Sequence, residues 1–185
     1  MSTLTSHWLP VLLSSVAVFV VSSLMHMLLP WHRSDQAKLP NEAAVADILR
    51  SIPAGDYRMP FASGPEEMRS AEFMERAAKV PMAIVTIMAG DMTSRFKRAL
   101  FQWFVYSLVV SWLAGHIAGS TLAAGASSEM VFHTVGLTAF LGYGMALAQQ
   151  PIWGGKPWIP TLKSMVDALI YAAVTAGIFV WCWPG

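Results

Sequence analysis

The sequence predicts an all-α membrane protein, a four-transmembrane-helix bundle with a small cytoplasmic α+β insertion between the first two helices. Of its 185 residues, 55% are hydrophobic and only 12% are charged, and the mean hydropathy is +0.51. Soluble domains carry roughly 25% charged residues. A water-soluble fold of this size could not hide so much apolar surface, so we expect part of that surface to face lipid.

Four segments are long and apolar enough to cross about 30 Å of hydrocarbon. We expect the spans at residues 8–29, 99–119, 130–148 and 162–183. Formal charges are nearly absent from these segments, with Asp167 inside the fourth and Glu129 at the edge of the third.

The basic residues predict how the bundle is oriented. All 12 Lys and Arg residues lie either between the first and second spans or between the third and fourth. Because basic loops stay on the cytoplasmic side, both connections are expected inside and both termini outside. The tryptophans near the ends of the spans agree with this arrangement, since indole rings favour the membrane interfaces.

The connection at residues 31–97 is too long to be a simple loop. Its pattern predicts a helix from Glu42 to Ser51 and a second helix from Pro65 to about Lys79. The β-branched stretch from Met82 to Met88 is either a strand or a segment that rests on the membrane. Residues 57–61 are expected to pair with that strand.

Two ionisable side chains, His26 and Asp167, fall at similar depths near the inner boundary of the first and fourth spans. Charged groups in lipid are costly and often functional. The pair is interpreted either as a proton- or ligand-binding site or as a clamp that joins the two helices.

A second group of polar residues is predicted at the outer side. Glu129 and His133 share a helix face, His116 lies near the end of the neighbouring span, and His7 lies at the same level on the first helix. Imidazoles and a carboxylate suit a transition metal, and one histidine could ligate haem. The alternative is that these residues are hydrogen-bonded packing residues, and no cofactor is firmly predicted.

Two further features have alternative interpretations. The cluster of His32, Arg33 and Asp35 either grips lipid phosphates or a partner, or marks where the chain enters water. Gly136, Gly142 and Gly144 form a small-residue face for close packing, within the chain or in an oligomer.

Several classes of function lack their signature in this sequence. It has no GxSxG, no P-loop, and no GxGxxG after a strand. The single cysteine, Cys182, forms neither an intrachain disulfide nor a zinc motif. The formal net charge of +1 and the absence of a dense basic run argue against nucleic acid.

Short phrases at the ends of the spans carry a resemblance. The first span opens with His7-Trp8-Leu9-Pro10, the third ends in Gln149-Gln150-Pro151-Ile152-Trp153, and the fourth contains Asp167-Ala168-Leu169-Ile170-Tyr171. This layout resembles small four-pass bacterial inner-membrane proteins of unknown function. The resemblance implies the topology and a bacterial inner membrane, and it implies no activity. The connection at residues 39–91 is longer than expected for that group.

The sequence therefore predicts a non-catalytic membrane protein, either an accessory or scaffold subunit with a membrane protein partner or a homo-oligomer. One alternative is a small transporter or channel that uses His26 and Asp167. The second alternative is a metal- or haem-binding redox protein that uses the outer residues.

Overall fold

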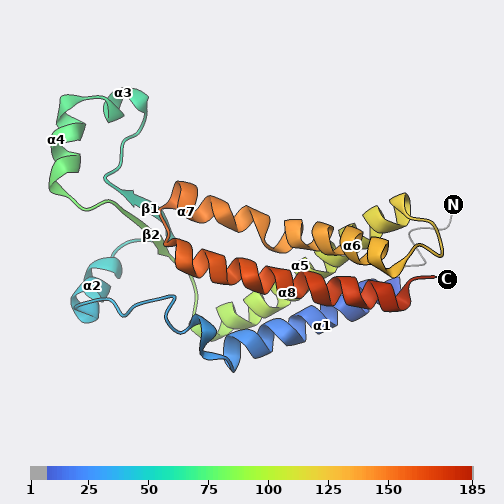
Figure 1. Ribbon diagram of the computed structural model, residues 1–185. Coiled ribbons are helices and arrows are strands. Elements are labelled where there is room, and N and C mark those ends of the chain that lie inside the picture. The colour runs from blue at the N-terminus through green and yellow to red at the C-terminus, as the bar shows by residue number, and fades with distance from the viewer. Residues whose placement is uncertain (1–7, 185) are drawn as a thin grey trace. The chain divides into compact units, whose positions relative to one another are not determined.

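The computed structural model describes residues 8–184, and the chain divides into two compact units (Figure 1). One unit comprises Met1–Ala37 and Thr93–Gly185, and the other comprises Lys38–Met92. The first unit holds the long helices and the second is the predicted insertion.

Four helices are long and apolar enough to cross a membrane, as predicted. They are α1 (Trp8–Met27), α5 (Met92–Thr121), α6 (Ser128–Tyr143) with its extension to Gly154, and α8 (Trp158–Cys182). The extension consists of the 3₁₀ turn η2 (Met145–Ala148) and the short helix α7 (Gln149–Gly154). The α-helical part of the third span therefore ends at Tyr143, earlier than the predicted boundary at residue 148.

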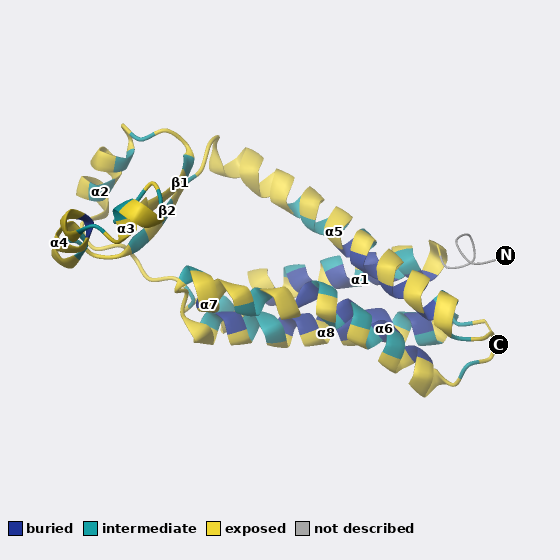
Figure 2. Cartoon of the chain, turned by 90° about the horizontal axis from the view of Figure 1, so that it is seen from above, coloured by how far each residue is buried: buried dark blue, intermediate teal, exposed yellow. Residues whose placement is uncertain are grey.

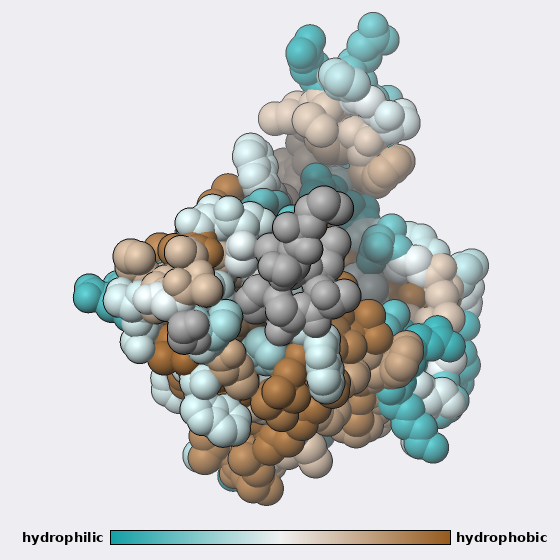
Figure 3. Space-filling view, turned by 90° about the vertical axis from the view of Figure 1, so that its right-hand side faces the viewer, coloured by the Kyte–Doolittle hydropathy of each residue, from teal (hydrophilic) through white to brown (hydrophobic). Residues whose placement is uncertain are grey.

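The long helices bury small and hydroxyl-bearing residues and expose large apolar ones. On α1, the serines at positions 14, 15 and 22 are buried, whereas Leu12, Val16, Val20 and Leu24 are exposed. Figure 3 shows hydrophobic side chains spread over the surface of the bundle. A water-soluble bundle has the reverse arrangement, and small residues between helices are typical of packing in lipid.

The small-residue face of α6 packs inside the chain. A Cβ on Gly142 would lie 3.0 Å from Val110 of α5, and one on Gly144 would lie 2.8 Å from the Cβ of Ala168 on α8. Close approach of the helices therefore accounts for these glycines, and the face no longer supports a homo-oligomer.

The second unit contains two strands and three short helices. Their order is α2 (Glu42–Leu49), β1 (Gly55–Met59), α3 (Pro65–Met68), α4 (Ala71–Lys79) and β2 (Ala83–Ile87). The strands form an antiparallel pair with Tyr57 opposite Val85, which confirms the predicted pairing, but the first strand is Gly55–Met59 and not residues 57–61.

The single helix predicted from Pro65 to Lys79 is wrong, because the chain breaks at Ser70. The Ser70 hydroxyl accepts a hydrogen bond from the Phe73 amide and so begins α4 as a new helix.

Glu67 links the loop before α3 to α4, since its carboxylate accepts hydrogen bonds from Ser63 and from Arg76. The Ser63 hydroxyl, the Ser63 amide and Arg76 lower the pKa of Glu67 to about 2.

The close contact at Gly144 can be tested with Gly144→Ala. The added Cβ would meet the Cβ of Ala168, which no side-chain rotation can move, so we expect the free energy of unfolding to fall by about 1–3 kcal/mol. Thermal unfolding in mild detergent, followed by circular dichroism, measures the change. Gly177→Ala on α8 is the control, because its Cβ would meet nothing within 4 Å. A loss of stability for Gly177→Ala, with none for Gly144→Ala, would contradict this packing.

Candidate functional site

The end of α1 folds back on itself and brings two histidines together. α1 ends at Met27, and Pro30 opens the 3₁₀ turn η1 (Pro30–His32). Proline cannot continue the helix, because it lacks an amide hydrogen and its ring clashes with the preceding turn. The His32 ring therefore lies against the His26 ring, with the centroids 4.5 Å apart and the planes 10° apart.

His32 bridges two carboxylates. Its Nε2 lies 2.7 Å from Oδ2 of Asp167 on α8, and its Nδ1 lies 2.5 Å from Oδ2 of Asp35. The side chain of Asp167 is only 3% exposed. An ionised carboxylate can only accept, so each ring nitrogen of His32 donates when both acids are ionised. His32 is then an imidazolium that links η1 to the middle of the bundle.

Lys163 completes the charge balance of this cluster. It precedes Asp167 by about one turn of α8, and its Nζ donates to Oδ1 of Asp35 at 2.7 Å. The same ammonium donates to the Trp31 carbonyl oxygen and to the Ser34 hydroxyl, each at 2.9 Å. The hydrogen bond from Lys163, followed by that from His32, lowers the pKa of Asp35. Two cations therefore face two carboxylates, which suits a group placed beside apolar helices.

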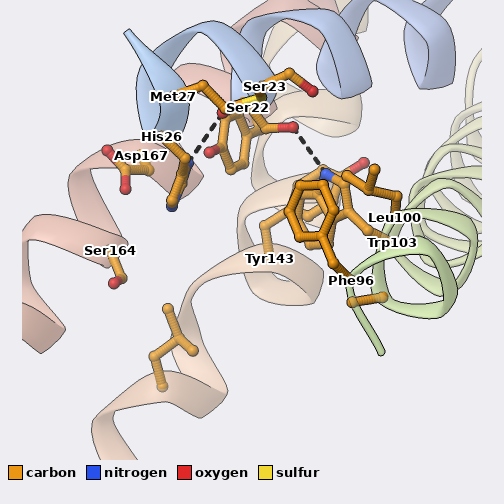
Figure 4. A pocket seen from close by; sticks show the side chains of 13 residues that line it. Ser22, Ser23, His26, Met27, Phe96, Leu100, Trp103, Tyr143, Ser164 and Asp167 are labelled. Carbon is orange, nitrogen blue, oxygen red and sulfur yellow. Dashed lines mark hydrogen bonds between the residues drawn. The ribbon is translucent and has the colours of Figure 1, made fainter. Parts of the chain in front are cut away.

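The predicted direct contact between His26 and Asp167 is replaced by the contact of Asp167 with His32. His26 lies beside Asp167 in Figure 4, but its Nδ1 donates to the Ser22 carbonyl oxygen at 3.0 Å. Depth along the helices placed His26 and Asp167 at one level correctly. It missed His32, because the reversal of the chain after Pro30 brings a residue from outside the span back to that level.

A cavity of about 430 Å³ adjoins this cluster, and residues of all four spans line it (Figure 4). The first half of α5 is mostly exposed, and one face of its second half is buried from Ser107 onward (Figure 2). The walls are largely apolar, and His26, Asp167, Tyr143 and Tyr171 supply polar groups. Trp103 stands on one wall, and its Nε1 donates to the Ser22 hydroxyl at 2.8 Å.

Three polar atoms of the cavity lining lack a partner among residues 8–184. They are Oδ1 of Asp167 and the hydroxyl oxygens of Tyr143 and Tyr171, and all three are buried. Buried polar atoms in folded proteins are nearly always hydrogen-bonded, so such atoms call for water, an ion or a ligand. The polar end of the cavity is thus the part of the bundle whose bonding is incomplete.

The residues predicted to lie on the outer side behave differently from the cluster around His32. Glu129 and His133 are 85% and 68% exposed and lie 4.0 Å apart, whereas His116 stacks on Trp112 of its own helix. Across the described residues, the only group of three donors close enough to share an ion is His26, His32 and Asp167. His7 lies outside the described residues. The structure therefore does not assemble His116, Glu129 and His133 into the predicted outer metal site.

Comparisons with models of known protein families, with curated proteins and with solved structures find no match to this chain. The resemblance to small four-pass bacterial proteins therefore stays a prediction, and the function is inferred from the geometry of the site.

The contact between His32 and Asp167 can be measured with a double-mutant cycle. Each of His32→Ala and Asp167→Ala should destabilise the protein, because each leaves a buried charged group without its partner. A hydrogen bond between charged groups contributes about 1.5–3 kcal/mol, so we expect a coupling energy of that size. Unfolding in detergent with EDTA present gives the four free energies. Effects that add to within about 0.5 kcal/mol would show that the two side chains do not interact.

Proposed function

We propose that this chain is an integral membrane protein that binds a small amphipathic molecule in the cavity at the inner end of its helices. One observation carries the proposal: the cavity has apolar walls, and its polar end holds Oδ1 of Asp167 and the Tyr171 hydroxyl without partners among the described residues. This is the usual make-up of a small-molecule site, mostly apolar with a few convergent polar groups.

The size and charge of the cavity indicate the class of molecule. Its volume of about 430 Å³ lies within the range of small-ligand pockets, roughly 300–1,000 Å³. While His32 carries a proton on both ring nitrogens, His32 and Lys163 balance the two carboxylates, so a neutral molecule fits this state better than a charged one. An amine or hydroxyl head could donate to Asp167 and an apolar body could contact Phe96, Leu100 and Trp103.

A binding cavity agrees better with the predicted transporter role than with the predicted scaffold role. A scaffold needs neither the cavity nor the incompletely bonded carboxylate, and the glycines of α6 are used within the chain. The proposal concerns the binding step that any such transporter requires. The accessory or homo-oligomeric role stays a prediction that the outward-facing apolar surfaces of the helices permit.

The orientation that we propose places the cavity near the cytoplasm of a bacterial inner membrane, with both termini outside. The distribution of the 12 basic residues supports it, because all of them lie in the two connections assigned to the inside or in the helix ends that adjoin these connections. Lys163 of the charged cluster belongs to this set.

Binding can be tested with 1-aminoanthracene, a neutral aromatic amine whose fluorescence reports a water-excluded environment. We expect saturable binding to the protein in lipid nanodiscs with EDTA present. Ala99→Phe should weaken binding at least about tenfold, because Ala99 lines the cavity and is itself exposed, so the larger ring fills the cavity without disturbing the core.

The matched control is Val109→Phe, which introduces the same ring on the same helix at a position 46% exposed and away from the cavity. It should bind the probe as the unaltered protein does. Absence of saturable binding, or equal binding by Ala99→Phe, would contradict the proposed function.

A further inference from the structure

We infer that the polar end of this cavity is a site for a divalent transition-metal ion, held by His26, His32 and Asp167. One donor atom from each of the three side chains lies within 4.8 Å of the other two. Two imidazoles from α1 and η1 thus converge with a carboxylate of α8, and Asp167 lies 135 residues after His32 in the sequence.

Both histidines are oriented as metal ligands usually are. Such histidines donate one ring N–H to a carbonyl or carboxylate, which fixes the ring and leaves the other nitrogen for the metal. Nδ1 of His26 donates to the Ser22 carbonyl oxygen, and Nδ1 of His32 bonds Asp35. The nitrogen left to bind a metal is therefore Nε2 in both rings, and Asp35 is a positioning residue for His32.

Asp167 provides an independent indication of a ligand. Its side chain is 97% buried, Oδ2 has one partner, and Oδ1 has none among the described residues. Lys163 does not donate to Oδ1, because its ammonium donates to Asp35, to Ser34 and to the Trp31 carbonyl oxygen. A clamp between helices would need only the bond to Oδ2, whereas a bound cation accounts for Oδ1 and for His26 as well.

The donor set indicates which ions fit. Imidazole nitrogens with a carboxylate suit Zn²⁺, Co²⁺ and Ni²⁺, whereas Mg²⁺ and Ca²⁺ prefer all-oxygen sites. Metal–ligand bonds of about 2.0–2.1 Å place tetrahedral donors about 3.3 Å apart, so His26 must move closer and the 2.7 Å pair of His32 Nε2 and Asp167 Oδ2 must open slightly. His26 can make this adjustment, because it is exposed and its partners among residues 8–184 are the Ser22 carbonyl oxygen and the stacked His32 ring. The ion then takes the place of the proton that His32 Nε2 shares with Asp167.

Three protein ligands leave at least one coordination position open, as in catalytic rather than structural zinc sites. The inference goes beyond the proposed binding of an organic molecule and does not depend on it. Metal binding is measured without the probe, and probe binding is measured in EDTA, so each can fail alone.

The test uses full-length protein in detergent with its affinity tag removed and its metals stripped by EDTA. Titration calorimetry with Zn²⁺ should show one ion per chain, and Co²⁺ should give visible d–d absorption typical of nitrogen and oxygen ligands. His26→Gln should weaken Zn²⁺ binding at least about tenfold while leaving thermal unfolding of the metal-free protein unchanged, because His26 is exposed. Ala99→Phe, which fills the cavity, should retain the ion.

The matched controls are His133→Gln and His116→Gln, which remove exposed histidines at the other end of the helices. Both should bind Zn²⁺ as the unaltered protein does. The inference is overturned if the unaltered protein binds no Zn²⁺ at micromolar concentration. It is also overturned if His26→Gln binds normally, or if either control removes the binding.

Discussion

The hydrogen bond between Asp167 and His32 is the interaction around which the η1 end of the bundle is organised. Asp167 is an acid on an otherwise apolar stretch of α8, and a carboxylate there is costly unless donors or a cation accompany it. Its side chain is only 3% exposed, and His32 approaches it to 2.7 Å. The turn η1 supplies that partner, so the end of α1 is held against α8 by charge as well as by packing.

The apolar parts of the bundle make this contact possible. Serine, alanine and glycine between the helices let their backbones approach closely, as at Gly144 and Ala168. α5 is exposed through its first half, where Phe96, Leu100 and Trp103 border the cavity. The charged cluster thus stands at the end of a space with apolar walls, and this combination supports both the bound molecule and the bound ion that we propose.

Local properties of the sequence predicted most of the fold, and tertiary contacts account for what was missed. Apolar length is a local property, so the four long helices were predictable, as was the pairing of β1 with β2. The cap at Ser70 depends on a particular hydrogen bond, and the close approach of Gly144 to α8 depends on its contact with Ala168. Position along the helices placed His26 and Asp167 at one level. Only the folded η1 shows that His32 bonds Asp167 and stacks on the His26 ring.

The most direct measurement is solid-state NMR of the metal-free protein in lipid bilayers, with ¹⁵N-labelled histidine and ¹³C-labelled aspartate. The structure predicts a strong dipolar contact between His32 Nε2 and the carboxyl carbon of Asp167, because Nε2 and Oδ2 lie 2.7 Å apart. A second contact, from His32 Nδ1 to Asp35, should accompany it. A spectrum in which Asp167 contacts His26 instead of His32, or contacts neither, would contradict the account.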